Sequence, residues 1–162
     1  MEIRFSKTDK KYGCFSNFYP CKVEFDGIVY QNSEAAWQAQ KTLAKHKRME
    51  FSTMLPSEAK RAGRRVTLRE DWESIKYDLM VAVLEAKFTQ NKELGEVLKS
   101  TGDATIVEDT TGWHDNLWGS CPAGWCSSGK CGRNVPFQPE DYKRRPDTCK
   151  LKKIEIKDLI DY

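Results

Sequence analysis

The chain has 162 residues, which is the size of one folding domain with an ordinary hydrophobic core. Its 39% hydrophobic and 31% charged residues are typical of a soluble globular protein, and no apolar run approaches the ~20 residues of a membrane span. A net charge of +3 does not by itself indicate nucleic-acid binding, but it is compatible with an anionic small molecule or transient contact with DNA. The N-terminus carries no apolar signal segment, so we expect a cytoplasmic protein, with the nucleus as an alternative, and no membrane partner.

Three short strands are predicted within the first thirty residues. The segments Ile3–Phe5 and Cys21–Phe25 alternate apolar and polar side chains, as a half-buried strand does. Asp26-Gly27 is a strong hairpin turn that leads into the third strand, Ile28–Tyr30. We therefore expect a small antiparallel sheet near the N-terminus.

The loop Tyr12–Pro20 between these strands is dense in aromatic residues. It could simply cover the core. Alternatively it forms a pocket wall, in which Asn17 supplies a polar contact. The stacking surface would then come from Phe15, Phe18 or Tyr19. The density of aromatic side chains favours the pocket.

A helix is predicted from Ser33 to about Leu43, with an extension to Lys47 left open. Asn32 or Ser33 can cap it, because a short side-chain oxygen accepts hydrogen bonds from the first free backbone N–H groups. Its alanine and tryptophan residues can pack against other elements, so much of the helix should be buried.

One face of this helix carries three polar side chains. Glu34, Gln38 and Lys41 are spaced i, i+4 and i+7, which places them together at 3.6 residues per turn. The ordinary outcome is a solvated stripe with a weak ion pair. Glu34, however, lies in the first turn, where the helix N-terminus keeps a carboxylate ionised, as a general base or cation stabiliser requires. This face is the candidate active site.

Further helices are predicted over Met49–Leu55, from a cap at Ser57 to a stop at Gly63, and over Leu94–Ser100. The densest basic patch of the chain surrounds the second of these and consists of Lys60, Arg61, Arg64, Arg65 and Arg69. Such a patch is usually solvated surface. It could equally hold phosphate, because arginine offers a bidentate fork that matches phosphate oxygens.

The clearest helix is predicted over Asp71–Phe88, and a strand is predicted over Ala104–Val107. The core face of this helix repeats at intervals of three and four residues and consists of Trp72, Ile75, Leu79, Val83 and Ala86, widened by Met80, Leu84 and Phe88. Core packing explains all of these except Trp72, which lies in the first turn, where an aromatic ring could reach a ligand.

The six cysteines are expected to be reduced thiols, because a disulfide scaffold would normally be shorter and carry a secretion signal. Cys121, Cys126 and Cys131 are spaced more loosely than the paired cysteines of structural zinc sites. A zinc site completed by Cys149 or His114 is the alternative to free thiols.

Seven short motifs occur in order within about residues 5–135. They are Phe15-Ser-Asn-Phe18, Ser33-Glu34 with Gln38-Ala-Gln-Lys41, Ala59-Lys60 with Gly63-Arg64, Leu68-Arg-x-Asp-Trp72, Ala86-Lys-Phe88, Ile106-Val-Glu108 and Asp115-Asn-Leu-Trp-Gly119. With this ordered set the chain resembles the NADAR (YbiA-like) family. The resemblance implies a compact, mainly helical α+β single domain over residues 1–162, with a small antiparallel sheet.

The resemblance also implies hydrolysis of N-glycosidic bonds between a phosphorylated ribose and a base or amine, with no cofactor and no metal. Family members are associated with ADP-ribose on guanine, in nucleosides or DNA, and with phosphoribosylamino intermediates of riboflavin synthesis. The first substrate, and thus reversal of ADP-ribosylation, is the expectation here. A reader module that binds ADP-ribose without turnover is the non-enzymatic rival, and a cysteine-based zinc module is a third reading.

The family's site residues carry over by position. Those implied to be catalytic are Glu34, Lys41 and Asp115. Those implied to bind substrate are Phe15, Asn17, Phe18, Gln38, Arg64, Trp72, Trp118 and Gly119. After Gly119 the chain departs from the family pattern, so residues 120–162 are divergent. Ser120 stands where relatives often have an acid. Pro136 interrupts the helix that usually follows in the family.

Cleavage of a C1′–N bond passes through a ribose cation, so the site needs a carboxylate and a proton donor for the leaving nitrogen. Glu34 would activate water or stabilise the cation, and Asp115 would hold the ribose hydroxyls or the water. Lys41 would bind phosphate or, with a depressed pKa, form a transient imine with C1′. Trp72 and Phe18 would stack on adenine or on the base.

Overall fold

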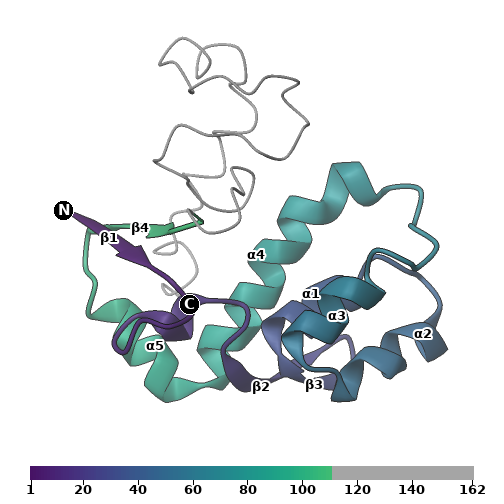
Figure 1. Ribbon diagram of the computed structural model, residues 1–162, viewed down its shortest axis with the longest axis horizontal. Coiled ribbons are helices and arrows are strands. Elements are labelled where there is room, and N and C mark those ends of the chain that lie inside the picture. The colour runs from purple at the N-terminus through teal and green to yellow at the C-terminus, as the bar shows by residue number, and fades with distance from the viewer. Residues whose placement is uncertain (111–162) are drawn as a thin grey trace, which may run out of the picture.

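The structure is a computed structural model that describes residues 1–110 (Figure 1). Its elements in chain order are β1 (Glu2–Phe5), the 3₁₀ turn η1 (Gly13–Phe15), β2 (Pro20–Phe25), β3 (Ile28–Asn32), α1 (Ser33–Ala39), α2 (Lys45–Glu50), η2 (Phe51–Thr53), α3 (Pro56–Ala62), α4 (Trp72–Gln90), α5 (Lys92–Lys99) and β4 (Thr105–Glu108). The predicted α+β class, mainly helical with a small antiparallel sheet, is confirmed. No helix within residues 1–110 combines the length and apolar character needed to cross a bilayer.

The antiparallel sheet is the hairpin β2–β3, as predicted. Asp26 and Gly27 form its turn with φ angles of 51° and 75°, the positive values that a two-residue hairpin of this hand requires. Val23 pairs with Tyr30, and both side chains are fully buried. A second, parallel pair joins β1 to β4 and ties the N-terminus to residues 105–108, a long-range contact that the sequence did not indicate.

Two hydrophobic clusters stabilise the described part of the chain. The first lies between the hairpin, α1, α3 and α4 and includes Tyr30, Trp37, Phe51 and Val83. The second lies where β1, η1 and α5 meet the C-terminal end of α4, on the left of Figure 1. Each fully buried large side chain contributes about 1.5–3 kcal/mol of hydrophobic free energy. The long helix α4 contributes to both clusters, so it fixes their relative position.

The helix α1 ends at Ala39, so the predicted end at Leu43 was wrong, and the extension to Lys47 does not occur. The N–H groups of Lys41 and Thr42 bond three residues back, to Gln38 and Ala39, which tightens and closes the helix. Leu43 is 67% exposed, so further helix would bury no apolar surface there. Lys41 therefore lies in the turn after α1, not two turns along it.

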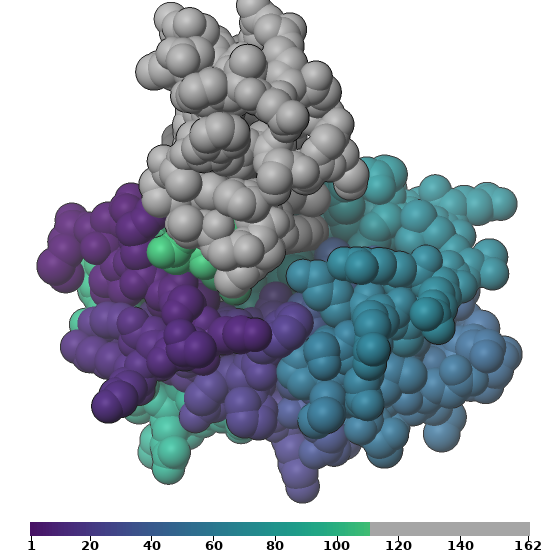
Figure 2. Space-filling view, viewed as in Figure 1, coloured from purple at the N-terminus to yellow at the C-terminus, as the bar shows by residue number. Residues whose placement is uncertain are grey.

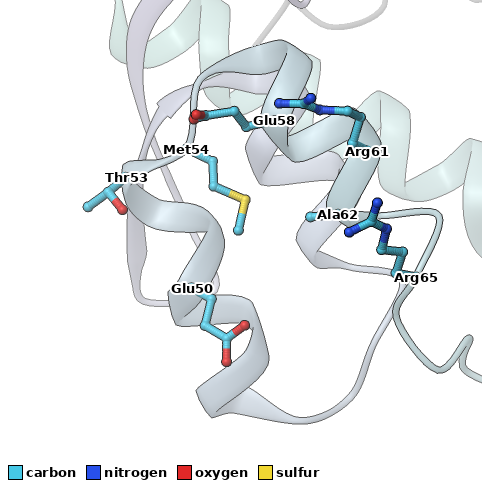
Figure 3. A pocket seen from close by; sticks show the side chains of 7 residues that line it. All are labelled: Glu50, Thr53, Met54, Glu58, Arg61, Ala62 and Arg65. Carbon is cyan, nitrogen blue, oxygen red and sulfur yellow. The ribbon is translucent and has the colours of Figure 1, made fainter.

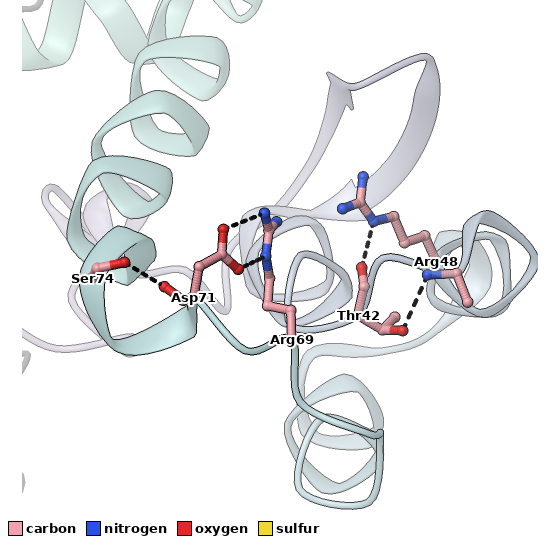
Figure 4. Close-up of polar contacts among 6 residues, drawn as sticks. Thr42, Arg48, Arg69, Asp71 and Ser74 are labelled. Carbon is pink, nitrogen blue, oxygen red and sulfur yellow. Dashed lines mark hydrogen bonds and ion pairs between the residues drawn. The ribbon is translucent and has the colours of Figure 1, made fainter.

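A buried arginine redirects the chain at this point (Figure 4). The Arg48 side chain donates from Nε to the Thr42 carbonyl at 2.7 Å, and its guanidinium pairs with Asp26 in the hairpin turn. The helix α2 begins at Lys45, so the helix predicted over Met49–Leu55 was misplaced and is represented only by the end of α2 and by η2.

The cap of α3 also differs from the prediction. Leu55, not Ser57, is the N-cap, because Pro56 occupies the first helical position, where its missing N–H costs nothing. The Glu58 carboxylate accepts from the Leu55 N–H at 2.8 Å. The stop at Gly63 is confirmed, and α4 and α5 agree with their predicted bounds within two residues.

The buried face of α4 agrees in part with the predicted one. Trp72, Met80, Val83 and Phe88 are buried as expected, whereas Ile75, Leu79 and Ala86 are only half-buried. The fully buried positions near the end of the helix also include Lys87, whose ammonium donates to the Ser16 carbonyl at 2.8 Å. Apolar periodicity could not predict this charged residue in the core.

Candidate active site

The helix α1 positions Glu34 through a well-formed cap. Asn32 accepts from the Ala35 N–H at 2.7 Å, as predicted, and its amide donates to the Met54 carbonyl at 3.0 Å. The first bond satisfies a free donor of the helix start, and the second ties that start to η2. Glu34 follows in the first turn with 7% of its surface exposed.

Glu34 and Gln38 form a buried hydrogen-bonded pair. The Gln38 amide donates from Nε2 to Glu34 Oε1 at 2.8 Å, and Gln38 is only 4% exposed. A donor to a buried carboxylate stabilises its ionised form and fixes its orientation. This face of α1 is therefore an interior site and not the solvated stripe that the same spacing usually gives.

Gly63 makes room for this amide. A Cβ placed on Gly63 would lie 1.9 Å from Gln38 Oε1, so the amide would have to move away. That oxygen is buried and has no hydrogen-bond partner among the described residues. A side chain at position 63 would therefore displace the Gln38 amide from its present place.

Lys41 lies against a pair of tryptophans at the junction of α1 and α4. Its ammonium is 5.4 Å from the Trp37 ring centre and 5.7 Å from that of Trp72, and it donates to the Gly63 carbonyl at 3.4 Å. The two indole rings are 5.1 Å apart. The Arg69 N–H donates to the Lys41 carbonyl at 2.8 Å and so fixes the backbone at this turn.

Burial lowers the pKa of Lys41 from its ordinary value. The Glu34 carboxylate acts in the opposite direction and raises that pKa, whereas the cations Arg64 and Lys60 lower it further. These interactions place one carboxylate and two further cations within electrostatic reach of Lys41.

The aromatic loop meets the start of α1 through Asn17. The Glu34 N–H donates to the Asn17 carbonyl at 3.1 Å, and the Ser33 hydroxyl donates to Asn17 Oδ1 at 2.9 Å. The Asn17 amide in turn contacts Met80 Sδ at 3.5 Å. The predicted pocket wall therefore lies directly beside Glu34.

The basic patch divides between two faces of α3. Lys60 and Arg64 act on Lys41, whereas Arg61 and Arg65 extend over a depression of about 560 Å³ on another side of the helix (Figure 3). That depression is lined by Glu50, Thr53, Met54, Glu58, Arg61, Ala62 and Arg65. It holds none of the predicted site residues. Arg69 is engaged with Asp71 through a bidentate pair at 2.6 and 2.9 Å (Figure 4).

Most predicted site residues within the described chain are brought together. Asn17 and Gln38 hydrogen-bond with Glu34, and Lys41 lies within its electrostatic reach. Trp72 and Arg64 are linked to the site through Lys41, and Phe18 follows Asn17 and lies beside Lys60. Phe15 is placed elsewhere, in the second hydrophobic cluster, where its ring centre lies 5.6 Å from Phe5 and 6.0 Å from Phe88. The predicted residues Asp115, Trp118 and Gly119, and the cysteines from Cys121 onward, lie outside the described residues.

Sequence reasoning missed Gly63 as a site residue, and it named Lys60 only as part of a basic patch that could hold phosphate. Nothing local pointed to the close approach of Gly63 to Gln38. Among residues 1–110 there is no cluster of three or more histidine, cysteine or acidic side chains that could hold a metal. Cys14 and Cys21 are free thiols.

Comparison with known proteins decides the family. The NADAR domain model matches residues 4–135. The chain belongs to the NADAR family. This NADAR protein is 40% identical over 120 residues to the N-glycosidase YbiA of Escherichia coli strain K12, covering 72% of its own length and 74% of the relative. It is 33% identical over 140 residues to the N-glycosidase Npun_R5314 of Nostoc punctiforme. This match covers 83% of this chain and 85% of the relative.

A similar structure is also known. The NMR structure of E. coli YbiA covers 74% of this NADAR protein and 73% of its own chain, with a TM-score of 0.64 and 40% identity. A more distant relative is the chloroplastic riboflavin biosynthesis protein PYRR of Zea mays, at 32% identity over 135 residues, which are 21% of that longer protein. Family membership and these N-glycosidase relatives support hydrolysis of an N-glycosyl bond as the reaction class.

Proposed function

We propose that this protein removes ADP-ribose from guanine, in a nucleoside or in DNA, and releases free ADP-ribose. The observation that carries the proposal is the buried Glu34 carboxylate, which Gln38 orients and which lies within electrostatic reach of Lys41; Arg64 and Lys60 act on the same lysine. A carboxylate is what a ribose cation needs, and a group of cations beside it is what a phosphorylated ribose needs. The tryptophans Trp37 and Trp72 supply an apolar wall that limits water at this point.

In this proposal Glu34 performs the central chemistry. Departure of guanine from C1′ leaves positive charge on the ribose, which the ionised carboxylate stabilises while it takes a proton from the attacking water. The water oxygen forms the new bond to C1′ as the C1′–N bond breaks, solvent water protonates the leaving nitrogen, and Glu34 returns its proton to solvent at the end of the cycle. Gln38 holds Glu34 in place by its 2.8 Å hydrogen bond, and Asp115 is proposed as the second carboxylate.

The role of Glu34 is tested by Glu34→Gln, which keeps the shape of the side chain and removes its charge. We expect turnover to fall by about 100-fold or more, because general-base and charge stabilisation are lost together, while ADP-ribose still binds. The matched control is Glu85→Gln, an exposed carboxylate on α4. Turnover in Glu34→Gln equal to that of the unmodified protein would show that Glu34 has another role.

Lys41 has two possible roles that one experiment separates. As a phosphate-binding cation it needs only its charge. As a nucleophile, its amine would displace the base at C1′, and the ribose ring would open to an imine that water hydrolyses; burial, which lowers its pKa, supports this role. Cyanoborohydride added during turnover would reduce such an imine to a stable adduct on Lys41. We favour phosphate binding, so we expect no adduct and retained activity in Lys41→Arg.

The substrate is tested by incubation with ADP-ribosylated guanosine and with guanine-ADP-ribosylated DNA, followed by mass spectrometry of free ADP-ribose. Release from either one supports the proposal, and the ratio names the preferred form. Binding of ADP-ribose without release would favour the reader module. The riboflavin biosynthesis proteins of Zea mays and Vibrio vulnificus among the relatives favour one further candidate, phosphoribosylamino pyrimidines, which belong in the same assay.

A further inference from the structure

Two lysines from distant parts of the chain approach the same aromatic ring beside the site. The Lys7 ammonium lies 5.5 Å from the ring centre of Phe18, and the Lys60 ammonium lies 5.8 Å from it. Lys7 follows β1, and Lys60 lies on α3. The N-terminal segment and the segment that includes α3 share one face of the molecule (Figure 2).

The approach of Lys7 and Lys60 to Phe18 brings two positive charges together. The two ammonium groups can be no farther apart than about 11 Å, the sum of their distances to the ring centre. Among residues 1–110, neither lysine forms an ion pair with a carboxylate. Two unneutralised cations over one ring raise the positive potential at this point, which favours the binding of an anion and weakens as salt is raised.

Lys7 and Lys60 adjoin the proposed active site. Lys60 lies close enough to Lys41 to affect its titration, as Arg64 does. Phe18 directly follows Asn17, whose carbonyl accepts from the Glu34 N–H. The cations beside Glu34 therefore extend outward from Lys41 and Arg64, past Lys60, to Lys7 at the exposed rim.

We propose that Lys7 and Lys60 form a clamp for the second phosphate of the ligand, with Phe18 holding the two side chains in place. The inference rests on the proposed function and deepens it, because it makes this protein selective for ribosides that carry a diphosphate over those that carry one phosphate. Each ammonium offers three donors to phosphate oxygens. Cation–π contact with Phe18 limits the rotamers of both lysines, so less conformational entropy is lost on binding.

The test is a series of ligands that differ by one group: adenosine, AMP, ADP and ADP-ribose, measured by calorimetry on the full chain. We expect a clear gain in affinity from AMP to ADP in the unmodified protein. In Lys7→Met/Lys60→Met, which keeps the apolar stems, this gain should disappear and ADP-ribose should bind roughly 10- to 100-fold more weakly. The affinities for adenosine and AMP should change much less.

Two controls separate a lost clamp from a damaged fold. Lys45→Met removes an exposed lysine from α2 and should leave every affinity unchanged. Lys7→Arg/Lys60→Arg keeps both charges and should restore most of the gain from AMP to ADP. The gain should also shrink as salt is raised, because both lysines border solvent.

Failure of the clamp and failure of the proposed function give different results. If the double methionine variant binds ADP-ribose as tightly as the unmodified protein does, or if ADP binds no better than AMP, the clamp is wrong even when ADP-ribosylated guanosine is turned over. If the gain is lost in the variant but no ADP-ribosylated guanine is ever hydrolysed, the clamp stands and the proposed reaction is wrong. If both hold, the variant should show a raised KM with kcat nearly unchanged.

Discussion

At the scale of single residues, the site depends on buried side chains that the chain holds in one orientation. The Gln38 amide is fixed between Glu34 and Gly63, and the Asn17 side chain is fixed by Ser33. Buried amides with defined partners are costly to move, because any displaced donor or acceptor loses its hydrogen bond in a dry environment. The carboxylate of Glu34 is therefore preorganised before any substrate arrives.

Gly63→Ala tests this orientation directly. The new methyl group would overlap Gln38 Oε1, so the amide must swing away from Glu34. We expect a stability loss of about 1–3 kcal/mol in urea denaturation, typical of overpacking, together with a large fall in kcat.

The double variant Gln38→Ala/Gly63→Ala separates the two effects. Without the amide there is space for the methyl group, so stability should recover relative to the sum of the single changes, whereas activity should stay low because Glu34 has lost its donor. Full activity in Gly63→Ala would show that the orientation of Gln38 does not matter.

At the scale of elements, local signals predicted the secondary structure well and long-range contacts explain the misses. The hairpin turn at Asp26 and the shared face of Glu34 and Gln38 depend on residues close in sequence, so they were predictable. The early end of α1 depends on Arg48, and the burial of Phe15 depends on Phe88, which pairs with it across the fold. No local pattern encodes such partners.

Arg48 gives a prediction at this scale. Its side chain is buried, bonds the Thr42 carbonyl and pairs with Asp26, so it joins the turn after α1 to the hairpin. Arg48→Met keeps the apolar stem but leaves the carbonyl unpaired. We expect a loss of about 2 kcal/mol in the free energy of unfolding, measured by urea denaturation.

The adjacent Lys47 is a matched control for Arg48. It is exposed and pairs with Glu50 at 2.9 Å, an arrangement that contributes less than about 1 kcal/mol. Lys47→Met should therefore shift the urea midpoint very little. Equal effects of the two substitutions would mean that Arg48 contributes only surface charge and does not anchor the turn.

At the scale of the whole described molecule, α4 connects the candidate site to the second hydrophobic cluster. Trp72 at its start touches Lys41, and Lys87 near its end holds the Ser16 carbonyl, one residue before Asn17. The aromatic loop is thus fixed at Ser16 by α4 and at Asn17 by α1. Burial of the charged Lys87 side chain destabilises the folded state, because a charge is unfavourable in the core. The same side chain holds the loop in position through its bond to Ser16.

This cost predicts how stability depends on pH. Burial lowers the pKa of Lys87 to about 8 in the folded protein, whereas the unfolded chain titrates near the ordinary 10.5. Between these values the unfolded state binds more protons, so the Lys87 contribution makes the folded state more stable as pH rises, by about 2 kcal/mol from pH 7 to 9.5. Burial raises the pKa values of Cys14, Cys21 and Tyr30, and these groups act in the opposite direction at alkaline pH.

The difference between the unmodified protein and Lys87→Met reports this contribution together with its coupling to Cys14 and Cys21, whose pKa values Lys87 lowers; both effects have the same sign. Urea denaturation at several pH values from 7 to 9.5 should show the unmodified protein gaining stability relative to the variant as pH rises. The variant should also lose activity at every pH, since the Ser16 carbonyl has lost its donor and the loop that carries Asn17 is less firmly held. A stability difference that does not change with pH would mean that Lys87 is solvated in the folded protein, and the loop would then be held by the contacts of Asn17 with Ser33, Glu34 and Met80.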